Sequence, residues 1–567
     1  MKTTLRLPDK STKINNHMMR KLLLLFFVIA GITSSQGQTT SPFGNVVLTS
    51  NSGNTHVQVK QNGDLHVNVA PNDATKFNED GFVHYSDFGA KGDGKTDDIN
   101  AIAGTHAYAN QHGLSVKANN GASYYIGGKD RTAYIQTDTD FGTATFIIDD
   151  KDVENIKASV FIINSNLKPY KLEGITSLKK NQKKIKANLT GPSLINVTND
   201  NVRHYIRYGL NQDNGSSQTD IFVVDENGKV DMNAPIIWDF ENITEITALP
   251  IDQETLTIKG GRFVTIANQA VSKYNYYSRN ITVRRSNVTI DGLVHQVKGE
   301  GEHGAPYGGF LSIRNCANVT VKNTVLTGHK TYKTIGSVGK PVSMGTYDIL
   351  VGHALNVSFI NCSQSNDIDD RTYWGIMGSN YCKNLLFDNC TFSRFDAHKG
   401  VANATIKNST LGHMGINAIG SGTFLVENST LQGGSLVNLR SDYGSTWQGE
   451  LIIKDCTFVP NGGRKSNASL IGGSYSGQHD FGYTAYMPEK ITIENLHIDD
   501  SNHTEDYKGP TIFSNFNAKK TDESYQEKFP NVITKKVILK NVTTESGKEI
   551  SLSPNKFMFN DVKVITK

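Results

Sequence analysis

The segments NVTVKNT (318–324), NVSFINC (356–362), NLLFDNC (384–390) and NATIKNS (403–409) repeat one pattern in a chain of 567 residues. Apolar or β-branched residues alternate with polar ones in each segment, which is the period of a β-strand. Five further segments share the pattern, at 287–293, 423–429, 450–456, 490–496 and 536–542. Each segment predicts one strand, and their recurrence predicts a repeat architecture.

We use the second-to-last residue of each segment as the marker of the repeat. The markers are Gly292, Asn323, Asn361, Asn389, Asn408, Asn428, Asp455, Asn495 and Asn541. Subtracting successive numbers gives intervals of 31, 38, 28, 19, 20, 27, 40 and 46 residues. The shortest intervals fit one bare coil of a right-handed parallel β-helix, and the longer ones fit the same coil carrying a loop. A propeller is disfavoured, because its antiparallel blades need roughly 40 residues each.

The preference for Asn at the marker has a physical reason. Stacked coils lie about 4.8 Å apart, so identical side chains stack and their amides can hydrogen-bond along the axis. Asn also tolerates the left-handed backbone that a coil corner needs. Cys362, Cys390 and Cys456 each follow a marker, and we interpret them as small buried residues inside the coil.

The composition excludes several classes of protein. The 58 Lys and Arg against 54 Asp and Glu give a net charge of +4, too balanced for a protein that binds nucleic acid by neutralising phosphates. With 37% hydrophobic residues, the chain is neither disordered nor a multi-span membrane protein. Five cysteines are too few for a disulfide scaffold.

The first 38 residues have the pattern of a signal peptide. Met19, Arg20 and Lys21 precede a short apolar run from Leu22 to Ile32, and small and polar residues follow. The run is too short to span a bilayer as a helix. We therefore expect a secreted or periplasmic protein without a membrane span.

The stretch DFGAKGDGKTDD (87–98) indicates which structure precedes the repeated strands. Gly92 and Gly94 supply turn conformations, and Thr96 or Asp97 can cap a following helix with Asp98 in its first turn. This helix would plug the open end of the coil stack. The stretch resembles the entry segment of the pectate-lyase-like β-helix superfamily, which includes polygalacturonase-like hydrolases, polysaccharide lyases, alginate epimerases and phage tailspikes.

The resemblance implies an all-β fold: a right-handed parallel β-helix with a short N-terminal capping helix and a β-rich insertion. We expect an N-terminal segment at 39–80, the β-helix entry and capping helix at 81–139, and the parallel β-helix at 261–567. Residues 140–260 lack the coil rhythm, so we expect a β-rich subdomain there, with a hairpin around Asn227. The basic run KKNQKKIK (179–186) is interpreted as a solvated turn.

Polar residues on successive coils between 363 and 483 form the candidate site, because the function of a solenoid usually lies on one lateral face. We predict four catalytic residues: Asp370, Asp396, His398 and Arg440. We predict ten residues that bind substrate: Arg371, Trp374, Arg394, Lys399, His413, Asn417, Asp442, Tyr443, Trp447 and His479. Charged groups beside aromatic rings suit a sugar, so the expected partner is an acidic polysaccharide.

Two chemistries remain open at this site. Hydrolysis needs two carboxyl groups across the glycosidic bond, and Asp370 and Asp396 would lie on neighbouring coils. Asp369 and Asp370 also resemble the adjacent Asp pair of polygalacturonases. Elimination or epimerisation needs a base such as His398 and a cation such as Arg440 beside the uronate carboxylate. We favour hydrolysis, because carboxylates outnumber candidate bases.

Neither chemistry requires a cofactor, although Asp367, Asp369 and Asp370 could hold Ca²⁺. A second patch, with Glu300, Glu302, His303 and His329, could form another site. The rival from a different class is a non-catalytic glycan-binding or adhesin solenoid, which would bind sugars without producing new chain ends. A structural tailspike-like protein is a third alternative.

Overall fold

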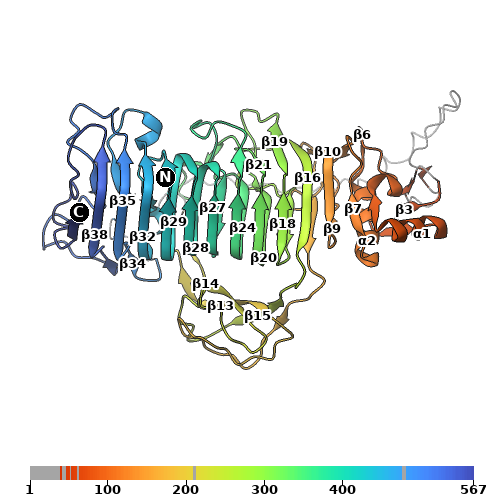
Figure 1. The fold of residues 1–567 in the computed structure, drawn as a ribbon, viewed down its shortest axis with the longest axis horizontal. Helices are drawn as coiled ribbons and strands as arrows, with labels where there is room; N and C mark the ends of the chain where they lie inside the picture. Colours follow the sequence, from red (N-terminus) through yellow and green to blue (C-terminus); the bar gives the residue numbers. More distant parts are fainter. Residues whose placement is uncertain (1–38, 41–45, 51–52, 61–62, 209–211, 476–480) are drawn as a thin grey trace, which may run out of the picture. The chain divides into compact units, whose positions relative to one another are not determined.

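The computed structural model of the protein describes residues 39–40, 46–50, 53–60, 63–208, 212–475 and 481–567. Its main body is a stack of coils whose strands run side by side from β5 to β39 (Figure 1). No helix among the described residues combines the length and the apolar character needed to cross a bilayer. The expected signal peptide, 1–38, lies outside these residues.

One row of strands carries the sequence repeat. It consists of β16 (Leu256–Ile266), β18 (Val288–Asp291), β20 (Gly308–Lys322), β24 (Tyr347–Ile360), β27 (Lys383–Asp388), β28 (Thr391–Lys407), β29 (Thr410–Glu427), β32 (Trp447–Phe458), β35 (Lys490–Ile498), β38 (Lys536–Thr544) and β39 (Lys563–Thr566). All neighbours in this row pair in parallel, and Val288, Val319, Val357 and Leu385 occupy one register position on successive coils. The predicted parallel β-helix is confirmed.

The remaining strands of the stack form its N-terminal coils and complete its other sides. They are β5 (Phe82–His84), β6 (Asp93–Asp97), β7 (Ser115–Lys117), β8 (Ser123–Ile126), β9 (Ala133–Ile135), β10 (Thr139–Asp149), β11 (Phe161–Asn164), β17 (Ile281–Arg284), β19 (Val294–Lys298), β21 (Val325–Leu326), β25 (Ser363–Gln364), β26 (Met377–Asn380), β30 (Thr430–Leu431), β31 (Val437–Leu439), β33 (Ser469–Gly473) and β36 (Thr511–Phe513). A continuous apolar core fills the interior of the stack, and the five cysteines are buried and free.

The marker residues behave as their chemistry predicts. Asn323, Asn361, Asn389 and Asn408 have φ between 51° and 54°, in the left-handed region. Asn361 Nδ2 donates to Asn323 Oδ1 at 3.3 Å, and Asn389 Nδ2 donates to Asn361 Oδ1 at 2.8 Å. The ladder is mixed, because Asn408 donates to Asp388 rather than to Asn389.

A second ladder, which we did not predict, runs along the first residue of the repeated segments. Asn318 donates to Asn287, Asn356 to Asn318, and Asn384 to Asn356, over 2.9, 2.9 and 2.8 Å. These residues also have positive φ, so both ends of each repeated strand turn a corner through Asn. The recurring Asn at the start of the segments was a visible signal for it.

The N-terminal end of the stack is covered as expected. Helix α2 (Ile99–His112) packs on β9, and Gly92 and Gly94 have φ of 60° and 73°. The expected cap is wrong in detail: Asp98 holds the N-cap position, and its carboxylate accepts from the N–H groups of Lys91 and Gly92. Beyond α2 lie α1 (Pro71–Asp80) and a sheet of β1 (Thr39–Thr40), β2 (Val46–Thr49), β3 (His56–Val59) and β4 (Leu65–Asn68).

The β-rich insertion is shorter than 140–260, because β10, β11 and β16 pair within the coils. It is an antiparallel sheet of β12 (Tyr170–Lys171), β15 (Glu245–Pro250), β13 (Ser193–His204) and β14 (Ser216–Val224), which projects from the side of the stack in Figure 1. The expected turn at Asn227 is present, since Gly228 N donates to Asp225 O. The 179–186 run is a largely exposed turn.

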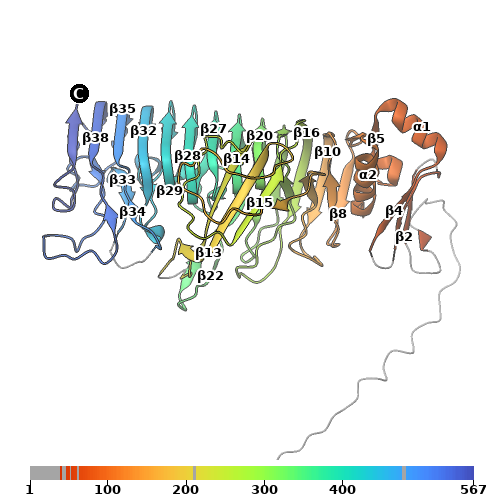
Figure 2. The ribbon, with the colours of Figure 1, turned by 90° about the horizontal axis from the view of Figure 1, so that it is seen from below.

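Two features fix the insertion to the coils. Leu194 and Ile221 pack with Ala317 and Leu355 of the stack in one buried cluster. Lys383 Nζ on β27 lies 2.8 Å from a carboxylate oxygen of Asp220 on β14, and both side chains are buried. The hairpin between β13 and β14 is thereby held against the coils that carry the candidate site. Figure 2 shows the insertion lying across the stack.

Two small strand pairs lie outside these layers. The hairpin β22 (Lys333–Ile335) and β23 (Pro341–Ser343) is antiparallel and extends one coil loop. The pair β34 (Ala485–Tyr486) and β37 (Asn531–Val532) is parallel.

Candidate active site

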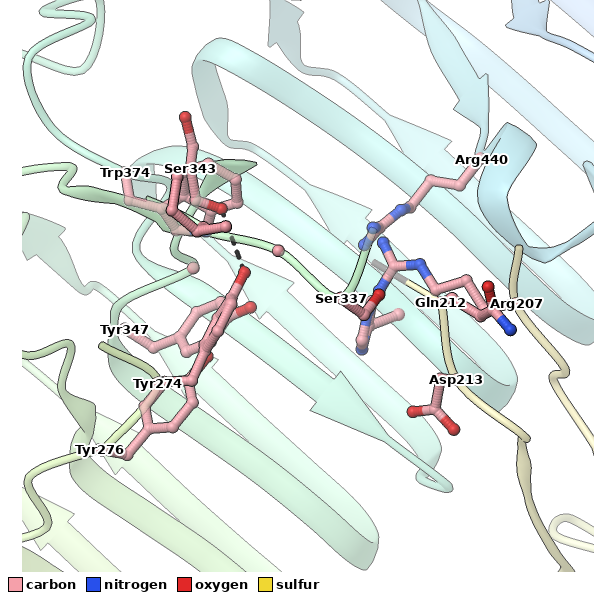
Figure 3. Close-up of a pocket in the computed structure, with 14 residues that line it drawn as sticks. Arg207, Gln212, Asp213, Tyr274, Tyr276, Ser337, Ser343, Tyr347, Trp374 and Arg440 are labelled. Carbon is pink, nitrogen blue, oxygen red and sulfur yellow. Dashed lines mark hydrogen bonds between the residues drawn. The ribbon is translucent and has the colours of Figure 1, made fainter. Parts of the chain in front are cut away.

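A cavity of about 330 Å³ opens between the coils, the insertion and the β22–β23 hairpin. Its lining comprises Arg207, Gln212, Asp213, Tyr274, Tyr276, Ile335, Gly336, Ser337, Ser343, Gly345, Tyr347, Trp374, His398 and Arg440. Figure 3 shows the tyrosines and Trp374 on one side and Arg207, Gln212, Asp213 and Arg440 on the other. The cavity therefore joins an aromatic wall to a charged wall.

Strand β28 supplies polar residues in the wall of this cavity and behind it. Side chains at alternate positions of a strand share one face, which places Arg394, Asp396 and His398 together. Arg394 Nη2 lies 2.7 Å from Asp396 Oδ2, and Arg440 Nη1 lies 3.7 Å from Asp396 Oδ1. Asp396 is fully buried, and neither carboxylate oxygen accepts a hydrogen bond from the described residues. The two arginines alone balance its charge.

Arg440 links this buried pair to the surface. Its Nη2 lies 2.8 Å from Asp442 Oδ2, and Asp442 also forms an ion pair with Arg207 of the insertion. Burial alone would raise the pKa of Asp442, but Arg440 and Arg207 hold it below the ordinary value. For Asp396 the balance is opposite: burial raises its pKa more than Arg394 and Arg440 lower it. Of these two carboxylates, Asp442 therefore keeps its negative charge more readily.

His398 is the basic group in the cavity wall that carries no positive charge. Burial lowers its pKa well below the ordinary value, and the nearby charges of Arg440 and Lys399 lower it further. Its Nδ1 lies 2.9 Å from Asn380 Oδ1. Because a carbonyl oxygen only accepts, Nδ1 carries the proton and Nε2 has the free lone pair. The neutral ring is set up to accept a proton at Nε2.

Tyr443 supports the cationic groups rather than lining the cavity. Its ring is buried, and Arg207, Lys399 and Arg440 lie over it at 4.9, 5.3 and 5.6 Å from the centroid. A ring face attracts cations electrostatically, so it holds three positive side chains close together. Trp374 is held similarly, with the Arg394 guanidinium 5.7 Å from its ring.

The structure brings together part of the predicted set. His398, Arg440 and Trp374 line the cavity, and Asp442 lines a neighbouring one. Arg394, Asp396, Lys399 and Tyr443 lie behind them, as described above. Asn417 is buried below, where it accepts from Asn438 Nδ2 at 2.8 Å. His479 lies outside the described residues.

Asp370, Arg371 and His413 form a separate group. Asp370 accepts from the N–H of Thr372, Arg371 donates to Asn461, and His413 Nδ1 lies 2.9 Å from Ile368 O. Among the described residues, none of these contacts reaches Asp396, and Asp370 is not part of the lining of the cavity at His398 and Arg440. The spacing of coils along the axis does not fix which side of the coil a loop residue faces.

Trp447 is also misassigned in the sequence prediction. It is 1% exposed, its Nε1 donates to Gly422 O at 3.1 Å, and its ring packs 5.1 Å from Phe424. It is a core residue and cannot contact a sugar. The possible Ca²⁺ site at Asp367, Asp369 and Asp370 is not supported either, because no group of three potential metal ligands gathers anywhere in the described parts of the chain.

The second predicted patch becomes a buried network. His295 Nδ1 and His329 Nε2 lie 2.8 and 2.9 Å from Asp348 Oδ1, and His329 Nδ1 lies 3.6 Å from Glu300. Burial alone would lower the pKa of His329, but Asp348 and Glu300 raise it to about 9. Glu302 and His303 are exposed and take no part in it. Since Trp374 N donates to His329 O, the network supports the aromatic wall.

The part of the lining that comes from outside 363–483 was not predicted from the sequence. Arg207 and Asp213 belong to the insertion, Tyr274 and Tyr276 to a loop, and Tyr347 to the start of β24. The run YNYY (274–277) was a visible signal, because clustered tyrosines are typical of binding surfaces. No signal in the sequence placed Arg207 beside Arg440.

No family model matches the chain. A capsule KL64-specific depolymerase of Klebsiella phage P510 is 28% identical over 124 residues, which are 20% of this chain and 12% of that protein. The chain thus spans about an eighth of the length of this curated relative.

Solved structures resemble the chain over most of its length. The tailspike protein gp49 of Pseudomonas phage LKA1 is 13% identical, covers 85% of this chain and 84% of its own, and has a TM-score of 0.50. The tailspike gp61 of Pseudomonas phage phi297 is also 13% identical, with a TM-score of 0.49. The match covers 81% of this chain and 80% of that tailspike chain. Together with the coil register, the first likeness shows that this chain has a parallel β-helix fold.

Proposed function

We propose that the protein is a carbohydrate-active enzyme that cleaves an acidic polysaccharide in the cavity at His398 and Arg440. One observation carries the proposal: a neutral imidazole and a guanidinium line the same cavity, opposite tyrosines and Trp374. Arg440 and Arg207, which pair with Asp442, would share their planar guanidinium groups with a sugar carboxylate, and the aromatic wall offers faces for sugar rings. The capsule-specific depolymerase among the relatives supports a polysaccharide as the substrate.

The cavity favours β-elimination over the hydrolysis that we expected from the sequence. Hydrolysis needs two carboxyl groups that reach the glycosidic bond. Among the described residues, Asp370 is not in the cavity lining, Asp396 is fully buried, and Asp442 is held between Arg440 and Arg207. Asp213 then remains as a single carboxylate in the described part of the cavity wall. Elimination needs one base and one group that neutralises the carboxylate, and both are present.

The reaction would proceed as follows for a uronate bound in the cavity. Arg440 and Arg207 bind its carboxylate, which acidifies the hydrogen on the adjacent carbon. His398 Nε2 takes that proton, the electron pair forms a carbon–carbon double bond, and the bond to the leaving glycosidic oxygen breaks. Tyr347, whose pKa is raised by burial and which therefore stays protonated, donates a proton to that oxygen.

The test is incubation with alginate, polygalacturonate and hyaluronan, which differ in linkage. We expect new reducing ends together with the ultraviolet absorbance of an unsaturated uronate for at least one of them. Substituting His398→Ala or Arg440→Ala should lower the rate at least about 100-fold. His497→Ala is the matched control, because His497 is an exposed residue on β35, far along the stack.

Each alternative has its own outcome. New reducing ends without unsaturation would contradict elimination and indicate hydrolysis. Binding without any new ends would indicate the non-catalytic glycan-binding solenoid.

A further inference from the structure

A second cavity, of about 640 Å³, adjoins the candidate active site. Its lining consists of Ser272, Lys273, Tyr274, Lys333, Thr334, Ile335 and Pro341. Tyr274 and Ile335 line both cavities, so the two are continuous. The walls are the 272–276 loop and the β22–β23 hairpin, neither of which supplies the proposed catalytic groups.

This cavity carries uncompensated positive charge. Lys273 and Lys333 are exposed, and neither forms an ion pair within the described part of the chain. Elsewhere the exposed lysines of the coils often have a partner, as Lys490 has Glu450 and Lys535 has Glu489. A lysine pair on the rim of a groove, with neither lysine in an ion pair, attracts an anionic ligand.

The same cavity offers apolar faces of the size of a sugar ring. Tyr274 is 47% exposed and Ile335 is 64% exposed, although both are large hydrophobic residues. Tyr274 is held in place because its hydroxyl donates to Ser343 O at 3.3 Å, an interaction drawn in Figure 3. A fixed, exposed ring beside two ammonium groups is suited to an acidic sugar.

A third cavity, of about 570 Å³, adjoins the active site on its other side. It shares Arg207 and Arg440 with the first cavity and includes Asn438, Asp442 and Ser474. The residues that the coils contribute to the three cavities follow one another along the sequence. The Lys273–Lys333 cavity is lined from 272–274 and 333–341, the active-site cavity from 274–276, 335–347, 374, 398 and 440, and the third cavity from 438–442 and 473–474. Because coils stack in sequence order, the cavities form one groove along the axis of the stack.

We propose that the Lys273–Lys333 cavity is a distal subsite that binds a further acidic sugar of the same chain. The polysaccharide then lies along the stack axis, with sugars bound on both sides of His398, and is cut in its interior. Cleavage in the interior of the polysaccharide rests on the proposed function. Binding of an acidic glycan at Lys273 and Lys333 does not depend on it.

The experiment compares the full chain with the double variant Lys273→Gln/Lys333→Gln. Binding of alginate, polygalacturonate and hyaluronan is measured by calorimetry at low and high salt. We expect the polymer that the wild type binds most tightly to bind about tenfold more weakly to the double variant, because two charge contacts are lost. The difference should shrink at high salt, where such contacts are screened.

The matched control is Lys183→Gln/Lys186→Gln, which removes the same charge from exposed positions of the insertion. It should bind like the wild type. Equal weakening in both double variants would show a general charge effect and overturn the subsite. A wild type that binds none of the three polymers would overturn it as well.

Cleavage products separate this proposal from the proposed function. If the wild type cuts the polymer in its interior, the first products are long, and the double variant should need more polymer for the same rate. Lysine-dependent binding without cleavage would leave the subsite standing and overturn the enzyme. Cleavage that is unaffected by the lysines, with unchanged binding, would overturn the subsite alone.

Discussion

His398 shows how one residue acquires a function from its surroundings. An ordinary histidine is half protonated near pH 6.5, whereas this one is buried among positive charges, and its pKa is lowered well below that value. It therefore stays neutral in mildly acidic solution, and Asn380 fixes which nitrogen accepts the proton.

The first prediction concerns the pH dependence of cleavage. Only neutral His398 can act as the base, so kcat/KM should stay level as the pH falls through 6.5 and decline only at lower pH. Lys399→Gln removes one of the charges that lower the His398 pKa, so this decline should move to higher pH in the variant. A pH–rate profile with its acidic limb at or above 6.5 in the wild type would contradict the assignment.

The Asn ladders are the second feature at the scale of single residues. Asn361 combines a left-handed backbone with one ladder bond to Asn323 and one from Asn389. The sequence alone was sufficient to predict this ladder, because both the backbone requirement and the repeat are local. The Cys residues after the markers were predictable for the same reason.

We predict that Asn361→Ala lowers the free energy of unfolding by about 2 kcal/mol, because it loses the ladder bonds and strains the backbone. Asn361→Gly loses the bonds but accepts the left-handed conformation, so it should cost about 1 kcal/mol less than Ala. Urea unfolding of the two variants measures the difference. If Ala is tolerated as well as Gly, the backbone does not select Asn here.

At the scale of elements, the insertion is the part of the site that the sequence could not reveal. Arg207 precedes Asp442 by more than 200 residues, yet the two form an ion pair. Their meeting depends on how the insertion docks, and docking depends on contacts such as Lys383 with Asp220. No periodic pattern encodes such a contact, so the insertion was recognised as β-rich but not as a wall of the cavity.

We predict that Lys383→Met destabilises the protein by about 3 to 5 kcal/mol, because it leaves the Asp220 carboxylate buried without its cation. Cleavage should fall as well, since the hairpin that carries Arg207 is no longer held. The double variant Lys383→Met/Asp220→Asn removes both charges and should recover most of the stability and activity. Thermal unfolding and the cleavage assay measure both, and a single variant as stable as the wild type would contradict this account of docking.

At the scale of the whole molecule, the coil stack explains both the successes and the failures of the prediction. The repeat placed Arg394, Asp396, His398 and Arg440 near one another, because the first three lie on β28 and Arg440 directly follows β31. It did not foresee that Asp370, on a loop, is absent from the cavity lining, or that Trp447 points into the core. A repeat fixes position along the axis, but the side of the coil depends on loop conformation.

An acidic polysaccharide bound in the groove across His398 and Arg440 underlies both the proposed cleavage and the distal subsite. The most direct measurement is a crystal structure of the His398→Gln variant with a uronate hexasaccharide of the polymer that the wild type binds most tightly. We expect one sugar carboxylate on Arg440 and Arg207, and further sugars extending toward Lys273 and Lys333. An oligosaccharide bound on another face, with this groove empty, would contradict the account.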